Sequence, residues 1–370
     1  MNKKFLKSYI IKFWERSYDF SQFCFLEKLL FCGLIFLEQF YKFIFYIILF
    51  FKKSIKKSKN YKFKVVSVGN ISVGGTGKSV FVQFLAKKFL SIRCAVVMRG
   101  YKSLAERDNK NYLINNKTDK SKLFYAGDEA LMLFNNLHIP IVVGADRQKS
   151  CDLLNNLVDI VFLDDAYQNF SIKKDFEILL LDAKYPFENG HCLPAGRLRE
   201  KDISRADAII LTHADILSTS ELANLKNKLA IKFDKNNIFT GKHFFSGLYL
   251  FDENMVDENL LKNKKILAFA GIGSCDSFKN SLKNIGFINF KFLEFQDHCE
   301  YTQIDINQIL DIYYSNNIDA IITTQKDWVK ISKFLNNKNN IDIYTLRIEF
   351  NFLEKEEEKK FLTKLKNKLL

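Results

Sequence analysis

Residues 66–81 read VSVGNISVGGTGKSVF, and this stretch decides the fold class. A short β-branched run at 65–68 precedes a glycine-rich turn, and the apolar residues of SVFVQFLAKKFL then recur at helical spacing. A strand, a glycine turn and a helix in this order are typical of a phosphate-binding loop. Ser72, however, stands where the strict pattern G-x-x-x-x-G-K-[ST] has its first glycine. The competing interpretation is a glycine-rich turn that binds no ligand.

The turn contains the groups that a nucleotide and its metal require. Glycines allow main-chain N–H groups to turn toward phosphate oxygens, Lys78 adds a cation, and the hydroxyl of Ser79 can ligate Mg²⁺. The start of the following helix adds its partial positive charge. The residues predicted to bind ATP are Gly74, Gly75, Thr76, Gly77, Lys78 and Ser79.

A second buried strand ends in two acids. In DIVFLDDAYQNF, residues 159–170, the apolar run is followed by Asp164 and Asp165. Acids at the carboxyl end of such a strand lie beside the phosphate site, so one of the two can hold Mg²⁺. Further apolar strands at 178–181 and 208–211 alternate with helices. We therefore predict an α/β protein with a doubly wound parallel sheet of the phosphate-loop NTPase type.

Composition limits the classes of function. The chain of 370 residues has 48% hydrophobic and 26% charged residues, in the range of a folded protein. Its seven Cys are scattered without a Cys-x-x-Cys pair, which indicates a reducing compartment rather than a disulfide framework or a zinc site. The net charge is +14, but +10 of it lies in residues 1–64. Because these basic residues flank an apolar segment, we do not expect nucleic-acid binding.

The N-terminal segment is both apolar and basic. Apolar runs at 29–37 and 43–51 are separated by Glu38 and Lys42, and neither run reaches the roughly 20 residues that span a bilayer. Glu38 and Lys42 are four residues apart and can pair on one helical face. Seven Lys within 52–64 favour an anionic, cytoplasmic membrane surface. We predict a membrane-associated helix, either interfacial or spanning, and a core helix with a basic tail is the alternative.

Several further stretches fit one family together. They are VGNISVGGTGKS (68–79), MRGYKS (98–103), GDEA (127–130), VVGADR (142–147), FLDDAYQN (162–169), LPAGRLRE (193–200), FAGIGSCDSF (269–278), FQDHCEY (295–301) and TTQKDWVK (323–330). In these stretches, and in this order, the chain resembles the tetraacyldisaccharide 4′-kinases, the lipid A 4′-kinases of Gram-negative bacteria. The family also has serine at the position of Ser72, so the resemblance accounts for the broken pattern.

The chain departs from the family's usual motifs at a few positions. The replaced residues are Ala166, Tyr167, Asn169, Arg197 and Gln325. The residues retained beside them are Asp164, Asp165, Gln168, Arg199 and Lys326. The departures therefore concern the shape of the sugar site more than the reaction.

The resemblance implies a lipid kinase. Members of the family transfer the γ-phosphate of ATP to the 4′-hydroxyl of a tetraacylated glucosamine disaccharide 1-phosphate in lipid A biosynthesis. The resemblance indicates that Asp128 accepts the hydroxyl proton and that His298 supports it. Lys78 and Arg147 complete the predicted catalytic residues. The predicted substrate-binding residues, whose guanidinium or amide groups suit phosphate and hydroxyl oxygens, are Asn70, Arg99, Gln168 and Arg199.

The expected organisation follows from the positions of these motifs. The expected parts are a membrane-associated helical segment (1–60), a kinase core (61–238), a β-rich linker (239–254), a smaller α/β domain (255–350) and an amphipathic helix (351–370). We expect a monomer that closes on ATP about a hinge. Because the acyl chains of the substrate stay in the bilayer, we expect the protein at the cytoplasmic face of the bacterial inner membrane.

Two other functions compete with this one. THAD, residues 212–215, lies where phosphate-loop GTPases have [NT]-K-x-D, which favours a GTPase or metallochaperone, although His213 breaks the pattern. The second is a membrane-attached binding protein that uses a nucleotide only as a switch. A preference for GTP over ATP supports the first alternative, and slow hydrolysis without a phosphorylated lipid supports the second.

Overall fold

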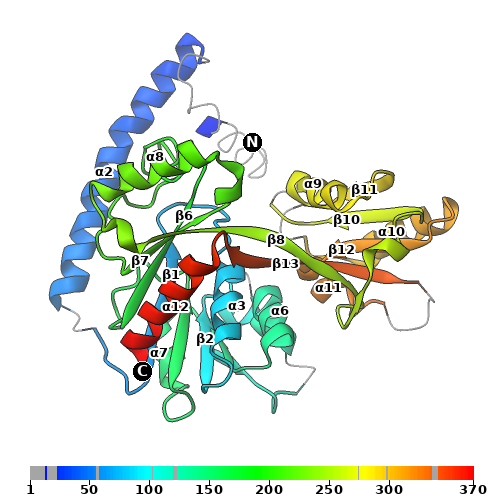
Figure 1. Cartoon of the computed structure of the whole chain (residues 1–370), viewed down its shortest axis with the longest axis horizontal. Helices are drawn as coiled ribbons and strands as arrows, with labels where there is room; N and C mark the ends of the chain where they lie inside the picture. Colours follow the sequence, from blue (N-terminus) through cyan, green and yellow to red (C-terminus); the bar gives the residue numbers. More distant parts are fainter. Residues whose placement is uncertain are drawn as a thin grey trace. The chain divides into compact units, whose positions relative to one another are not determined.

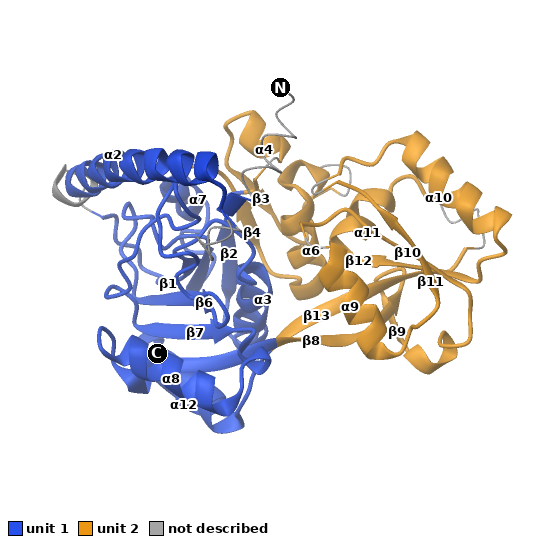
Figure 2. Ribbon diagram, turned by 90° about the horizontal axis from the view of Figure 1, so that it is seen from above, with its two compact units in different colours: residues 1–99, 146–242, 351–370 blue, residues 100–145, 243–350 orange. Residues whose placement is uncertain are grey.

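The chain forms two compact units, which Figure 2 shows in separate colours. The computed structural model describes residues 13–14, 23–55, 58–101, 103–119, 123–273, 275–296, 299–335 and 341–370. Unit 1 comprises residues 1–99, 146–242 and 351–370, and unit 2 comprises 100–145 and 243–350. This division differs from the expected boundaries, because 100–145 cluster with unit 2 and the C-terminal helix clusters with unit 1.

Unit 1 is built on a parallel sheet. Its strands are β1 (Lys64–Asn70), β2 (Cys94–Met98), β5 (Ile160–Asp164), β6 (Phe176–Asp182), β7 (Ala208–Thr212) and the first residues of β8 (Ile238–Leu250). Their order across the sheet is β8, β7, β6, β1, β5, β2, and all five pairings are parallel. The chain passes from β1 to β2 and β5 on one side and then crosses to β6 on the other. The direction of winding therefore reverses at β1, where doubly wound sheets bind ligands.

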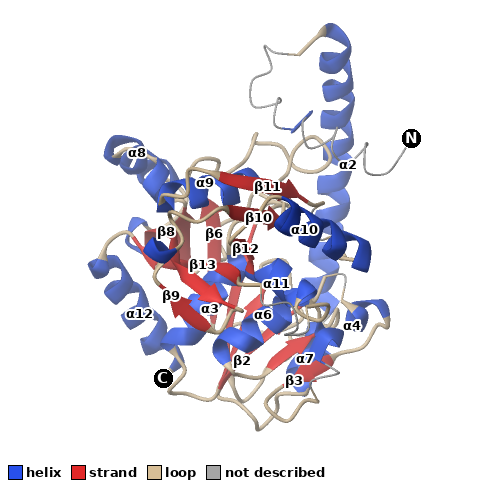
Figure 3. Ribbon diagram, turned by 90° about the vertical axis from the view of Figure 1, so that its right-hand side faces the viewer, coloured by secondary structure: helices blue, strands red, loops and turns tan. Residues whose placement is uncertain are grey.

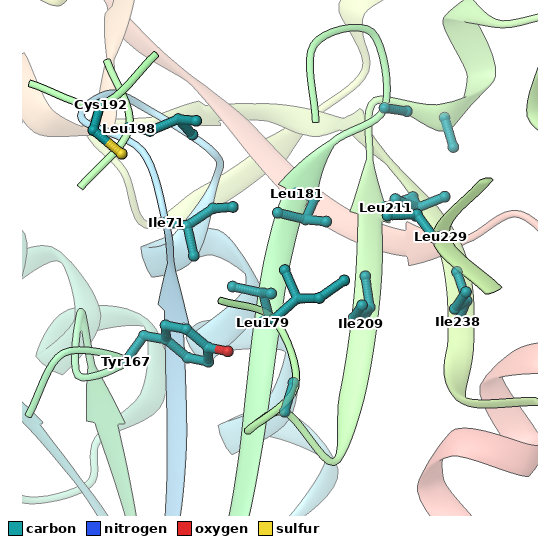
Figure 4. Close-up of a cluster of buried hydrophobic side chains, with 14 residues drawn as sticks. Ile71, Tyr167, Leu179, Leu181, Cys192, Leu198, Ile209, Leu211, Leu229 and Ile238 are labelled. Atoms are coloured by element: carbon teal, nitrogen blue, oxygen red, sulfur yellow. The ribbon is translucent and has the colours of Figure 1, made fainter. Parts of the chain in front are cut away.

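Helices cover both faces of this sheet (Figures 1 and 3). They are α3 (Lys78–Lys88), α7 (Arg147–Asp152), α8 (Thr219–Ala230) and α12 (Lys355–Leu369), with short 3₁₀ turns at Ala214–Ile216 and Lys235–Asn237. The long helix α2 (Phe25–Ile55) instead contacts the loop residues 191–199. Successive residues of a strand point to opposite faces. On one face Leu179 and Leu181 of β6 pack in a cluster with Leu229 of α8, as Figure 4 shows. On the other face Phe176 of β6 packs against Phe361 of α12.

Unit 2 contains a second, smaller parallel sheet. This sheet is formed by the remainder of β8, β9 (Asn254–Val256), β10 (Ile266–Ala270), β11 (Phe290–Glu294), β12 (Ala320–Thr324) and β13 (Ile343–Phe352). Two further strands of unit 2, β3 (Tyr112–Ile114) and β4 (Ile141–Val143), are not part of it. β10 pairs in parallel with β11 on one side and with β12 on the other, and β12 pairs in parallel with β13. The winding of this sheet reverses at β10. β3 with β4, and β8 with β9, form antiparallel pairs.

The helices of unit 2 also lie on both faces of its sheet. They are α4 (Leu104–Arg107), α6 (Asp128–Leu137), α9 (Cys275–Ile285), α10 (Gln303–Ser315) and α11 (Gln325–Ile331), with 3₁₀ turns at Phe124–Ala126 and Glu258–Leu260. Ala268 of β10 packs with Phe278 of α9, whereas its neighbour Phe269 packs with Ile306 of α10. Both sheets are therefore buried on two sides, and the predicted α/β fold with a smaller second domain is confirmed.

The apolar helix α2 packs against the rest of unit 1 through a buried carboxylate. Glu38 is 1% exposed and accepts hydrogen bonds from Cys192 N at 2.9 Å and from His191 Nδ1 at 2.8 Å. Lys42 Nζ pairs with the same carboxylate at 2.5 Å, as its four-residue spacing predicts. Burial alone would raise the pKa of Glu38, but these three partners outweigh it and hold the pKa below its ordinary value. Among the described residues, Phe25–Phe51 is the one stretch that is long and apolar enough to cross a membrane.

Candidate active site

The predicted phosphate loop follows β1 in unit 1. Gly74 and Gly77 have φ angles of 146° and 77°, which residues with a side chain rarely adopt. A Cβ atom added at Gly74 or Gly75 would meet no atom within 4 Å, so the space beside these two residues of the turn is open. Lys78 is the first residue of α3, whose first-turn N–H groups have no partner within the helix. An open turn beside a helix start suits an anion such as a phosphate group.

Ser72 keeps the start of the loop extended. It forms an isolated antiparallel bridge with Leu198. Val73 N donates to Arg197 O at 2.8 Å, and Arg199 N donates to Ile71 O at 2.7 Å. Residues in such a paired, extended segment do not need a left-handed φ, and this is why serine is tolerated where the strict pattern has glycine.

The acidic strand lies next to the loop. β5 pairs with β1 so that Asp164 stands opposite Val68, and Asp165 follows it at the carboxyl end of the sheet. Lys78 Nζ lies 3.6 Å from Asp165 Oδ1, and Arg199 NH1 lies 3.0 Å from the same oxygen. Burial alone would raise the pKa of Asp165, but the charges of Lys78 and Arg199 outweigh it and keep the carboxyl ionised. The structure therefore brings together three side chains that were predicted from separate motifs.

A polar network fixes the orientation of Arg199. Gln168 Oε1 accepts from Arg199 NH1 at 3.1 Å, and Gln168 Nε2 donates to Asn70 O at 2.9 Å and to Glu200 Oε1 at 2.8 Å. Glu200 in turn pairs with Arg205 at 2.9 Å. Glu200 and Arg205 were missed by the sequence reasoning, and the only signal was the place of Glu200 inside LPAGRLRE. Three of the four predicted substrate-binding residues thus meet in one cluster beside the loop.

Arg147 is a buried cation behind the two acids. It begins α7, is 6% exposed, and donates from NH2 to Asp164 O at 3.2 Å. Burial lowers the pKa of its guanidinium, while the charges of Asp164 and Asp165 oppose that shift and the nearby charge of Arg99 adds to it. A guanidinium remains charged at any physiological pH. Arg147 therefore stabilises the end of β5 and neutralises part of its acidic charge.

Two side chains of the loop suit a further ligand. The amide of Asn70 and the hydroxyl of Thr76 are buried, and neither has a hydrogen-bond partner among the described residues. Buried polar groups of this kind normally find a partner in a bound molecule or water. The described residues contain no group of three or more His, Cys, Asp or Glu side chains able to enclose a metal ion. A Mg²⁺ ion here would depend on phosphate oxygens and water for its remaining ligands, as is usual for Mg²⁺ with nucleotides.

Asp128 lies in a pocket of unit 2. It begins α6, and the pocket is lined by 100–101, 126–130, 271–273, Lys326 and Lys330. Asp128 Oδ2 lies 3.4 Å from Lys330 Nζ, and Glu129 pairs with Lys326. Both lysines come from α11, and the motif TTQKDWVK that encodes it gave no signal for a role of Lys330. The predicted partner of Asp128, His298, lies outside the described residues.

Together the reversed winding at β1, the open turn and the acids of β5 define a phosphate-loop nucleotide-binding protein. A family model described as tetraacyldisaccharide-1-P 4′-kinase matches residues 30–369. The chain belongs to this family.

Individual relatives agree with the family match. The tetraacyldisaccharide 4′-kinase of Desulfatibacillum aliphaticivorans is 34% identical, over 86% of this chain and 87% of that one. The protein of the same name from Halothermothrix orenii is 31% identical, over 81% of this chain and 83% of that one. A solved structure of LpxK from Aquifex aeolicus in complex with ATP superposes with a TM-score of 0.74 at 28% identity, and covers 92% of this chain and 100% of the other. These matches favour a kinase over the GTPase alternative.

Proposed function

We propose that the protein transfers the γ-phosphate of ATP to the 4′-hydroxyl of a tetraacylated glucosamine disaccharide 1-phosphate in lipid A biosynthesis. The single observation that carries the proposal is the open glycine turn that ends in Lys78, beside Asp165, in a chain of this family. The relative from Aquifex aeolicus was solved in complex with ATP, which supports ATP as the phosphate donor.

The residues of the loop are assigned to the nucleotide. Main-chain N–H groups of the turn and of the first turn of α3 bind the phosphate oxygens, and Lys78 neutralises their charge. The residues of the turn concerned are Gly74, Gly75, Thr76 and Gly77. Mg²⁺ would be held by Ser79 with Asp164 or Asp165, and when bound it neutralises charge on the phosphates during transfer. The buried hydroxyl of Thr76 gains a partner when the site is filled.

The proton of the acceptor hydroxyl is assigned to Asp128. The hydroxyl oxygen forms a bond to the γ-phosphorus, and the bond from that phosphorus to the β–γ bridging oxygen breaks. ADP leaves with the electron pair of the broken bond, and the hydroxyl proton passes to the Asp128 carboxylate. His298 is proposed to support Asp128, and Arg147 to balance the charge of the acids. Asn70, Arg99, Gln168 and Arg199 remain the proposed contacts to the phosphorylated sugar.

We further propose that α2 lies in the plane of the membrane surface at the cytoplasmic face of the inner membrane. Glu38 stands near the middle of this 31-residue helix and is buried against 191–192, while Tyr41 OH donates to Arg199 O at 3.0 Å. A spanning orientation would place those irregular loops in the hydrocarbon core, where main-chain groups cannot be satisfied. The exposed side includes Phe36, Phe40 and Phe43, which suit an interfacial position.

Phosphate transfer is tested by incubating the purified protein with γ-labelled ATP, Mg²⁺ and the disaccharide lipid in detergent, followed by thin-layer chromatography. We expect label in the lipid. A matched disaccharide with hydrogen in place of the 4′-hydroxyl serves as the control, and it should stay unlabelled. Transfer of label to this control, or no label in either lipid, would refute the assignment of the acceptor.

The orientation of α2 is tested by labelling with a membrane-impermeant maleimide in sealed vesicles. Cys24 precedes the helix and is exposed, and a second cysteine is introduced as Phe51→Cys while Cys32 is changed to serine. An in-plane helix leaves both thiols accessible from the same side of the vesicle. Labelling of the two thiols from opposite sides would show that the helix spans the bilayer.

The protein is proposed to act as a monomer, with the lipid substrate and the membrane surface as its partners. Size-exclusion chromatography with light scattering in detergent tests this, and we expect the mass of one 43.3 kDa chain after correction for detergent.

A further inference from the structure

The pocket around Asp128 is built by two helices of unit 2 that are far apart in sequence. α6 provides Asp128 and Glu129, and α11 provides Lys326 and Lys330. The ionisable side chains that line the pocket with Asp128 are Tyr101, Glu129, Lys326 and Lys330, as far as the described residues extend. The pocket therefore contains two neighbouring acid–lysine pairs, Asp128 with Lys330 and Glu129 with Lys326.

The side chain of Lys330 is more deeply buried than the carboxylate that it faces. Its side chain is 10% exposed, whereas that of Asp128 is 39% exposed. Its Nζ lies 3.4 Å from Asp128 Oδ2, and no other ion pair or hydrogen bond to this carboxylate occurs among the described residues. A carboxylate at the first position of a helix can also turn back toward the N–H groups of its own first turn. The ammonium group of Lys330 is what opposes that rotation.

The helix that carries Lys330 is itself anchored at several points. Gln325 and Asn136 exchange amide hydrogen bonds at 3.1 and 3.3 Å, which ties the start of α11 to the end of α6. Asp327 Oδ2 accepts from Gly271 N at 3.0 Å and from Thr324 Oγ1 at 2.7 Å, which ties α11 to the turn after β10. These contacts fix the position from which Lys330 reaches Asp128.

We propose that Lys330 is a positioning residue for the reaction: it fixes the Asp128 carboxylate so that one oxygen is bound by the ammonium group and the other faces the acceptor hydroxyl. The proposal rests on the proposed role of Asp128 as proton acceptor. It separates the two lysines of the pocket, because Lys326 pairs with Glu129 instead. Lys330 acts only through Asp128 and touches neither nucleotide nor lipid.

The test is a double-mutant cycle on the full-length enzyme in the lipid kinase assay. Lys330→Met is expected to lower kcat by about tenfold to a hundredfold, a part of the roughly 10²- to 10⁴-fold that a positioned general base contributes. The KM for ATP and the melting temperature stay at wild-type values. Lys330→Arg restores most of the rate because it keeps the cation. In an Asp128→Asn background, Lys330→Met causes less than about a twofold further loss, because residues that act as a unit are not additive.

A matched control removes a lysine of unit 2 that lies outside the pocket. Lys279→Met breaks the surface pairs with Asp276 and Glu294 and should leave kcat within about twofold of wild type. Where Lys330→Met does not fold, Lys330→Gln is measured in the same cycle.

The outcomes separate the inference from the function that it rests on. Equal losses from Lys330→Met in the wild-type and Asp128→Asn backgrounds, or no loss in the wild type, would overturn the role of Lys330. Near-normal turnover of Asp128→Asn alone would instead overturn the role of Asp128 as proton acceptor. A loss in the wild type that is absent from the Asp128→Asn background supports the proposal.

Discussion

Two glycine turns of this molecule lie in the same order of strand, turn and helix, but they differ in whether protein atoms fill the space beside the glycines. The turn after β1 in unit 1 and the turn after β10 in unit 2 each follow the strand at which the winding of a parallel sheet reverses, and each leads into an 11-residue helix. Such positions are where doubly wound sheets bind ligands. In the first turn a Cβ atom at Gly74 or Gly75 would meet nothing within 4 Å. The first turn is open.

The second turn is filled by the protein itself. A Cβ atom at Gly271 would lie 3.0 Å from Tyr301 OH and 3.2 Å from Asp327 Oδ1. The other oxygen of Asp327 accepts the main-chain N–H of Gly271. A carboxylate of the chain thus accepts a hydrogen bond from a main-chain N–H group of the kind that would bind a phosphate in the open turn.

A strand, a glycine turn and a helix therefore make a phosphate site only where the main-chain N–H groups are left open and a cation lies at the start of the helix. Unit 1 meets both conditions through Lys78. In unit 2 the closed turn forms part of the lining of the pocket that contains Asp128, through Gly271 and Gly273. The proposed phosphate donor therefore belongs at the open turn, and the proposed proton acceptor lies in the pocket beside the closed turn.

Asp128→Asn tests the pocket beside the closed turn, and it should lower activity more than any other single change. The amide keeps the size of the side chain but cannot take up the hydroxyl proton, so kcat should fall by about 10²- to 10⁴-fold. The dissociation constant for ATP, measured by calorimetry, should stay unchanged because the nucleotide binds at the open turn. A kcat near the wild-type value would contradict the assignment.

Lys78→Met tests whether the open turn binds the nucleotide. Loss of one preorganised cation at the phosphates should lower kcat/KM by about 10²- to 10³-fold, and ATP binding should weaken with it. Lys279→Met, which removes a lysine from the pair with Asp276 on the surface of unit 2, is the control and should leave both values unchanged. If Lys78→Met binds and uses ATP normally, the open turn is not the nucleotide site.

Asp327→Ala opens the closed turn. It removes the acceptor of the buried Gly271 N–H and of the Thr324 hydroxyl, and should lower the free energy of unfolding by about 2–4 kcal/mol. Asp276→Ala, an exposed acid in the first turn of α9, should change it by less than about 0.5 kcal/mol. Urea titration measures both variants, and equal stabilities would mean that Asp327 does not hold the turn.

Replacing one glycine of each turn by alanine should change stability and ATP affinity the least, but it should change a different one of the two quantities in each turn. Gly271→Ala brings a methyl group within about 3 Å of Tyr301 and Asp327, and should lower the free energy of unfolding by about 1–3 kcal/mol without changing ATP affinity. Gly75→Ala meets no protein atom, and should leave stability within about 0.5 kcal/mol of wild type while it weakens ATP binding. The reverse pattern would mean that the open turn is the structural one.

Much of unit 1 could be predicted from its sequence because its signals are local. The strand before the loop, the helix after it and the acids Asp164 and Asp165 are encoded by residues that are neighbours in the chain. The predicted pairing of Glu38 with Lys42 is confirmed for the same reason, since a helix brings residues four apart together.

Contacts between distant segments could not be predicted. Glu38 is buried against residues 191–192, about 150 positions away, and no local pattern indicates which loop covers it. Asp327 and Gly271, or Lys330 and Asp128, meet only because the sheet of unit 2 and helix α11 bring them together. The glycine pattern alone also does not distinguish an open turn from a closed one, because the difference lies in a carboxylate 56 residues further along the chain.

Amide hydrogen exchange with and without a non-hydrolysable ATP analogue tests the contrast between the two turns most directly. The nucleotide should slow exchange of the main-chain N–H groups at 74–79, because phosphate oxygens bind them. Exchange at 271–273 should stay unchanged, since Asp327 already holds that turn. Protection of 271–273 with none at 74–79 would contradict the proposal that the nucleotide binds at the open turn.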